Sequence, residues 1–160
     1  MYVATPNLLQ EMLAGLKSTL DGGKLYVFAG AAPADASAAL NMSTTHTQVA
    51  MFTESNDGTT GLTFGTPVGG LITKDGTEVW SGTVLFDGVD DSETTLTPTF
   101  FRFCEDGDDG RGVATGARIQ GTVGGPSSGA DFRLGADTVT ANGTNTVGAA
   151  VFEVSIVSLG

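Results

Sequence analysis

Hydrophobic positions in the first twenty residues follow a helical period. Thr5 followed by Pro6 is a typical N-cap and first-turn pair, and Gly22-Gly23 ends the pattern. Between these signals five large apolar residues recur at spacings of three and four: Leu9, Met12, Leu13, Leu16 and Leu20. The sequence therefore predicts one helix over about residues 6–20.

The apolar stripe of this helix is the candidate interaction surface of the chain. Five large apolar side chains on one helical face would form an exposed patch if nothing covered them. We expect the stripe to be buried, either against the sheet that follows or against a neighbouring subunit.

From Lys24 onward the apolar positions alternate or form short solid runs bounded by Gly, Pro, Asn or Asp. Such runs are typical of β-strands. The expected strands are residues 25–28, 49–52, 62–64, 78–86, 97–104, 117–123, 132–134 and 147–157. Residues 31–45, rich in Ala, Ser and Thr, suit either a short helix or a crossover loop, and we expect them to link two sheets.

The order of these elements indicates the fold class. One clear helix cannot supply the crossovers of a parallel sheet, so the strands favour an antiparallel β-sandwich. The length of 160 residues fits one domain. We therefore expect an all-β single domain over 1–160, with a helical segment at 1–22 and the β-sandwich at 23–160.

Charge and hydropathy exclude several classes of partner. The net charge is −11, from 18 acidic against 7 basic residues, so the chain should repel phosphate backbones and bind no nucleic acid. The sequence contains neither a membrane-spanning apolar run nor a secretion signal, and we expect no membrane contact. A single cysteine cannot form an internal disulfide, which favours synthesis in a cytoplasm.

The inventory of catalytic side chains is small. The chain has one histidine, His46, and one cysteine, Cys104, which ends an apolar run and is expected to be a core residue. His46 lies among hydroxyls, but the sequence has no Gly-x-Ser-x-Gly elbow to activate a nucleophile. The sequence predicts no catalytic residue, no cofactor and no enzymatic activity.

Two acidic loops carry most of the clustered charge, at Glu105–Gly110 and Asp87–Glu93. Oxygen-rich loops suit hard cations such as Ca²⁺, but the spacing does not match an EF-hand, and we expect no metal. Turn geometry itself favours Asp and Gly. We expect residues 87–93 and 105–109 to be solvent-facing loop tips.

Four pieces of the sequence form a recognisable series: KLYVFAG at 24–30 followed by PADA at 33–36, PTFFRF at 98–103, QGTVG at 120–124, and SGADFRL at 128–134. In this order they resemble small virion structural proteins of tailed bacteriophages and prophages, and the resemblance covers about residues 20–157. The chain departs from shorter members of that group by its N-terminal helix and by the acidic insertion between Cys104 and Ala117.

This resemblance implies a fold of jelly-roll type and a function without catalysis. It implies a capsid decoration or cement protein, made in the cytoplasm of the bacterial host and bound to the capsid exterior as a homo-oligomer, with the major capsid protein or other virion proteins as partners. A tail, collar or fibre component is the alternative. A third hypothesis is a carbohydrate-binding or hydrolytic sandwich in which Trp80, Tyr26 or a loop aromatic stacks on a sugar face while turn carboxylates bind its hydroxyls, although burial is the expected fate of Trp80.

Overall fold

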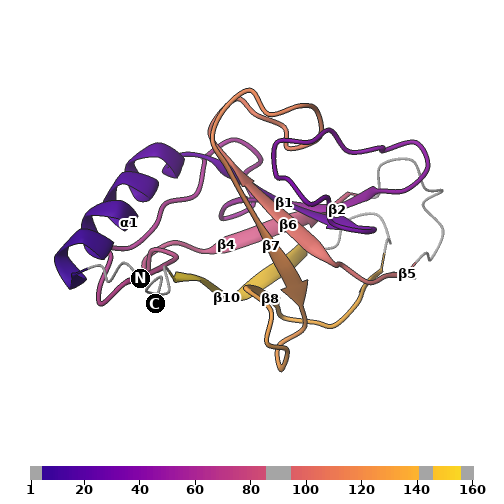
Figure 1. Ribbon diagram of the computed structural model, residues 1–160. Helices are drawn as coiled ribbons and strands as arrows, with labels where there is room; N and C mark the ends of the chain where they lie inside the picture. The colour runs from indigo at the N-terminus through magenta and orange to yellow at the C-terminus, as the bar shows by residue number, and fades with distance from the viewer. Residues whose placement is uncertain (1–4, 86–94, 141–145, 156–160) are drawn as a thin grey trace.

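The computed structural model describes residues 5–85, 95–140 and 146–155 (Figure 1). One helix precedes the described strands. In chain order the elements are α1 (Pro6–Leu20), β1 (Lys24–Ala29), β2 (Thr47–Glu54), β3 (Leu71–Thr73), β4 (Trp80–Val84), β5 (Thr95–Leu96), β6 (Phe100–Cys104), β7 (Arg118–Gly124), β8 (Phe132–Leu134), β9 (Val139–Thr140) and β10 (Thr146–Ser155).

The predicted helix is confirmed with both of its ends. Thr5 is the N-cap, and its hydroxyl oxygen accepts a hydrogen bond from the Leu8 amide at 3.4 Å. At the other end the Asp21 amide donates to the Lys17 carbonyl, and the Lys17 ammonium lies 2.6 Å from the Asp21 carboxylate. No helix in the described part of the chain has the length and apolar character that crossing a membrane requires.

The strands form a mixed, strongly curled sheet. Six of them, in the order β10-β4-β2-β1-β6-β7, make a half-barrel, which β3 and β8 extend at its two ends. Neighbours pair antiparallel except β7 and β8, and β8 also pairs with β10. The predicted strands differ from the structure in two ways. Residues 62–64 make single bridges rather than a strand, and the short strands β3, β5 and β9 were not predicted.

The mostly β class is confirmed, but the structure does not show the predicted sandwich of jelly-roll type. The prediction of two sheets rested on the short strands, on the lack of helices for crossovers and on the resemblance, but a single curled sheet meets the first two conditions equally well. In β6 all five residues, Phe100–Cys104, are buried. One face of this run packs inside the curl, and loops instead of a second sheet cover its other face.

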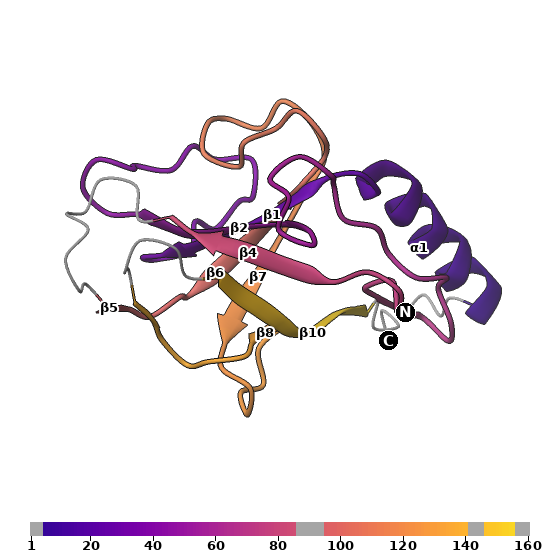
Figure 2. The same ribbon diagram turned by 180° about the vertical axis from the view of Figure 1, so that it is seen from behind.

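The inner face holds an aromatic core. Phe64 lies 4.8 Å from Phe103 between ring centroids, and Trp80 lies 5.2 Å from Phe152. Helix α1 sits at one end of the curled sheet (Figures 1 and 2), where Leu13 and Leu20 join the same buried cluster. The helix therefore closes one open end of the half-barrel.

The outer face of β1 and β6 lies under two loops, residues 30–46 and 105–117. Both figures show the two loops side by side on this face (Figures 1 and 2). Beneath them Tyr26, Phe28 and Cys104 belong to a second buried cluster. Segment 31–45 connects β1 to β2, which are neighbours in one sheet. The expectation that it links two sheets is wrong, because it folds back as a cover over its own sheet.

Candidate functional site

The acidic loop after β6 contains a buried ion pair. Arg118 holds Asp108 with two hydrogen bonds, from Nε to Oδ2 at 2.8 Å and from Nη2 to Oδ1 at 2.5 Å. Asp108 is 5% exposed. The prediction of a solvent-facing tip is therefore right for Asp106 and Asp109, which are exposed, and wrong for Asp108. The other predicted tip, residues 87–93, lies outside the described residues.

Hydrogen-bond donors around Asp108 determine the pKa values of the ion pair. Burial alone would raise the pKa of Asp108, but hydrogen bonds from Arg118 and from the amides of Gly110 and Thr115 outweigh it and lower that pKa to about 2. Burial would likewise lower the pKa of Arg118, and the Asp108 carboxylate reverses this and raises it. Both groups stay charged at neutral pH.

A second arginine completes the network. Arg102, on β6, is fully buried; it donates from Nε to the Gln120 Oε1 at 3.0 Å and from Nη1 to the Gly110 carbonyl at 2.8 Å. Burial lowers the pKa of Arg102, and the neighbouring Arg118 lowers it further. We call the set Arg102, Asp108, Arg118 and Gln120 the clasp.

The clasp joins the two covering loops to the sheet. Gln120 donates from Nε2 to the Pro33 carbonyl at 2.7 Å, and Arg118 donates from Nη1 to the Ala36 carbonyl at 3.3 Å. Both contacts reach loop 30–46 from β7, while Asp108 anchors loop 105–117 to the same strand. The clasp thus stabilises the outer cover of the sheet.

Gly110 is the backbone position that this arrangement requires. Its φ is +71°, a left-handed conformation that favours glycine. A Cβ at this position would lie 3.2 Å from both the Cys104 sulfur and the Tyr26 ring. The Asp-Gly pair at 109–110 is therefore part of a packed structure as well as a turn.

The side chains with catalytic or stacking potential are held in the fold. The His46 Nδ1 accepts a hydrogen bond from the Asn41 amide at 3.2 Å, and Nε2 lies 2.9 Å from the Ala31 carbonyl oxygen. Burial, together with the nearby Asp108 carboxylate, raises the pKa of the Cys104 thiol to about 12. In residues 5–85, 95–140 and 146–155, no group of three His, Cys, Asp or Glu side chains could hold a metal ion.

The aromatic side chains argue against a sugar platform in the described part of the chain. Trp80 is 2% and Tyr26 is 7% exposed, and the described phenylalanines are buried. Stacking on a sugar needs an exposed ring face. Trp80 and Tyr26 are both used in packing, so neither ring offers an open face to a sugar in this structure.

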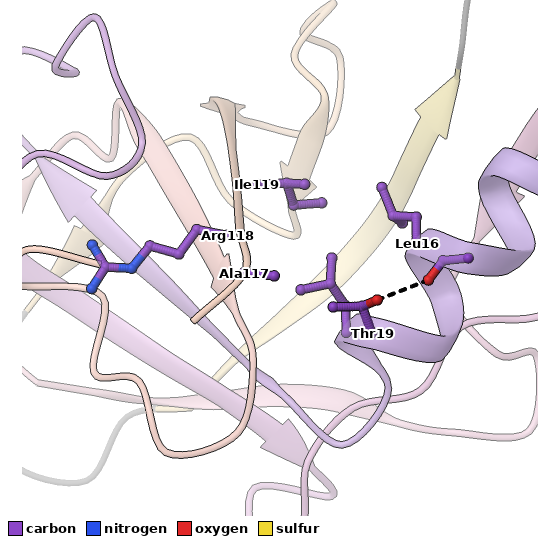
Figure 3. Close-up of a pocket in the computed structure, with 7 residues that line it drawn as sticks. Leu16, Thr19, Ala117, Arg118 and Ile119 are labelled. Atoms are coloured by element: carbon purple, nitrogen blue, oxygen red, sulfur yellow. Dashed lines mark hydrogen bonds between the residues drawn. The ribbon is translucent and has the colours of Figure 1, made fainter. Parts of the chain in front are cut away.

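A groove of about 270 Å³ runs between the C-terminal half of α1 and the start of β7 (Figure 3). Leu16 and Thr19 face Ala117 and Ile119 across it (Figure 3). The Thr19 hydroxyl donates to the Gly15 carbonyl at 3.0 Å, so its hydrogen-bonding need is met within the helix. The full lining is Gly15, Leu16, Thr19, Leu20, Ala117, Arg118 and Ile119.

The predicted apolar stripe divides into a buried and an exposed part. Leu13 and Leu20 are buried, and Leu9 and Leu16 are half-buried. Met12 is 49% exposed, and Leu8, which lies outside the predicted stripe, is 48% exposed. Its spacing of four residues from Met12 was the signal that could have identified it.

The groove presents little charge. Helix α1 carries only Glu11 and Lys17 as charged residues, and the Lys17 ammonium is bound to Asp21 and to the Phe64 carbonyl. Arg118 lines the groove, but its guanidinium points away from the helix, toward Asp108 (Figure 3). The groove is therefore an uncharged strip on an acidic protein.

Comparisons with models of protein families, with curated proteins and with solved structures find no match to this chain.

Proposed function

We propose that this protein is a virion structural protein that binds the outside of a bacteriophage capsid and stabilises neighbouring capsomers. The observation that carries the proposal is the combination of an acidic protein, with net charge −11, and exposed apolar side chains on its surface. Outside α1 these include Val68 at 72% and Val113 at 69% exposure. Such a surface suits binding through contact areas rather than chemistry at a pocket.

Two further features support a role as an outer cover. The clasp fixes both loops on the outer face of the sheet, which favours a rigid module that presents one constant surface. The resemblance to small virion proteins in segments 24–30, 33–36, 98–103, 120–124 and 128–134 points to the same class. A negative surface also fits exposure to solvent better than contact with packaged DNA.

The proposal is tested by removing the gene from the phage or prophage that encodes it. Particles that lack the protein should release their DNA at a lower temperature than complete particles, and adding the purified protein back should restore the original release temperature. Release at the same temperature in both kinds of particle would contradict a stabilising role.

We expect attachment to rest on apolar contacts, because exposed ion pairs contribute only about 0 to 1 kcal/mol each. Capsid occupancy should then stay constant as the salt concentration rises, and Asp106→Asn, a change at an exposed position, should leave it unaltered. An occupancy that falls steeply with salt would show that the acidic surface makes the contact instead.

A further inference from the structure

Four residues form a continuous stripe along the accessible side of α1. Leu8, Met12, Gly15 and Thr19 follow one another at spacings of four, three and four residues, which keeps them on one helical face. Leu8 and Met12 are about half exposed, and Gly15 and Thr19 line the groove. We call these four residues the α1 stripe.

The order of side-chain sizes along the α1 stripe is self-complementary. Two large residues come first and two small residues follow. When a second identical helix lies antiparallel across the stripe, Leu8 faces Thr19 of the second copy and Met12 faces Gly15 of the second copy. Each facing pair, which we call a layer, then joins a large side chain of one copy to a small side chain of the other. The two-fold axis repeats every contact.

Gly15 has the space that such packing requires. A Cβ built on Gly15 meets no atom within 4 Å. The open region continues into the groove toward Ala117 and Ile119. A methionine side chain from outside can therefore enter above Gly15 without displacing a residue of this chain.

Charge favours a second copy over a basic partner at this face. The chain as a whole carries −11, so two copies repel each other wherever their acidic surfaces meet. The four residues of the α1 stripe are uncharged, and the Lys17 ammonium of the same helix is already bound. Beside the stripe each copy has one exposed carboxylate, Glu11, whereas loop 105–109 carries four acidic residues. Two copies therefore meet less repulsion at the α1 stripe than at that loop, to which a basic partner would be drawn.

We propose that the α1 stripe is a homodimer interface, in which two copies of this chain pack their α1 helices antiparallel about a two-fold axis. The 15-residue helix is about 22 Å long, so the contact is smaller than the roughly 800 Å² per partner of a standard stable interface. We therefore expect a weak dimer that dissociates on dilution. This inference does not depend on capsid attachment.

Sedimentation equilibrium on the full chain tests the interface. The wild type should show a monomer–dimer equilibrium that shifts toward dimer as salt screens the repulsion between the acidic copies. Gly15→Leu places a large side chain opposite the large Met12 of the second copy, and Met12→Ala places a small side chain opposite the small Gly15 of the second copy. Each variant should raise the dissociation constant of the dimer about tenfold, which corresponds to about 1.4 kcal/mol of binding free energy.

The double variant separates an interface from a merely structural effect. Met12→Ala with Gly15→Leu restores a large residue against a small one in the layer and should recover most of the lost association. Val113→Ala, at an exposed apolar position on loop 105–117, serves as the control and should leave association unchanged. Circular dichroism checks that every variant is folded. A monomeric wild type, association insensitive to both single changes, or a double variant no better than the singles would overturn the proposal.

Discussion

Asp108 and Arg118 form a two-point ion pair in which the side chains are 3% and 2% exposed. Charges that are removed from water must find partners, and a buried pair that loses one partner leaves the other uncompensated. The pair lies where the acidic loop returns to β7, so its integrity decides whether the outer cover of the sheet stays in place.

Replacing Asp108 by Asn should therefore be costly. The change keeps the shape but leaves the buried Arg118 charge without a counter-ion, and we expect a loss of about 3 to 5 kcal/mol in the free energy of unfolding. Urea denaturation measures it. Asp106→Asn, in the same loop at an exposed position, is the matched control and should stay within about 0.5 kcal/mol of wild type. Equal and small losses in both variants would contradict the role of the clasp.

The same pair predicts an acid-sensitive component of stability. The pKa of Asp108 is lowered in the folded state from 3.8 to about 2, so its contribution is complete above about pH 4 and is lost as the pH falls toward 2. That difference corresponds to about 2 kcal/mol. The difference in free energy of unfolding between the wild type and Asp108→Asn should decrease by this amount when the pH is lowered from 4 to 2. A gap that stays constant would show that Asp108 titrates normally.

Cys104 should be unreactive in the native protein. Its side chain is buried, and burial raises the thiol pKa to about 12, so almost no thiolate exists at pH 8. A colorimetric thiol reagent should find no reactive thiol in native protein and one per chain in denaturant. Rapid labelling under native conditions would mean that the loops over β6 open readily.

Two neighbouring residues of α1 should differ sharply in their effect on folding. Leu13 is fully buried, and Leu13→Ala should cost about 2 to 5 kcal/mol. Met12 is 49% exposed, and Met12→Ala should change stability by less than about 0.5 kcal/mol when the protein is dilute enough to be monomeric. Similar losses at both positions would place the whole helix face in the core.

Local signals made the helix predictable from sequence. Thr5 and Pro6 mark its start, Gly22-Gly23 mark its end, and both operate within a few residues. The strands in solid apolar runs were predictable for the same reason. The arrangement of the strands was not predictable. A run such as Phe100–Cys104 can be buried by a second sheet or by loops, and the sequence of the run is the same in both cases.

The clasp was missed because aspartate in a Gly-rich loop usually marks a solvated turn. One signal pointed to it. Arg102 lies inside an apolar run, and a buried arginine requires acceptors close by. Gln120 and the Gly110 carbonyl supply them for Nε and Nη1, while the buried Nη2 has no hydrogen-bond partner among the described residues. Only the curled sheet brings β6, β7 and both loops together.

The central claim, that this protein decorates a capsid, is tested most directly by cryo-electron microscopy of virions from the phage or prophage that encodes it. We expect density that matches the half-barrel and its helix, repeated over the outer surface of the head. Density confined to one vertex, the collar or the tail would contradict it and favour a tail, collar or fibre component, and absence of the protein from purified virions would exclude both.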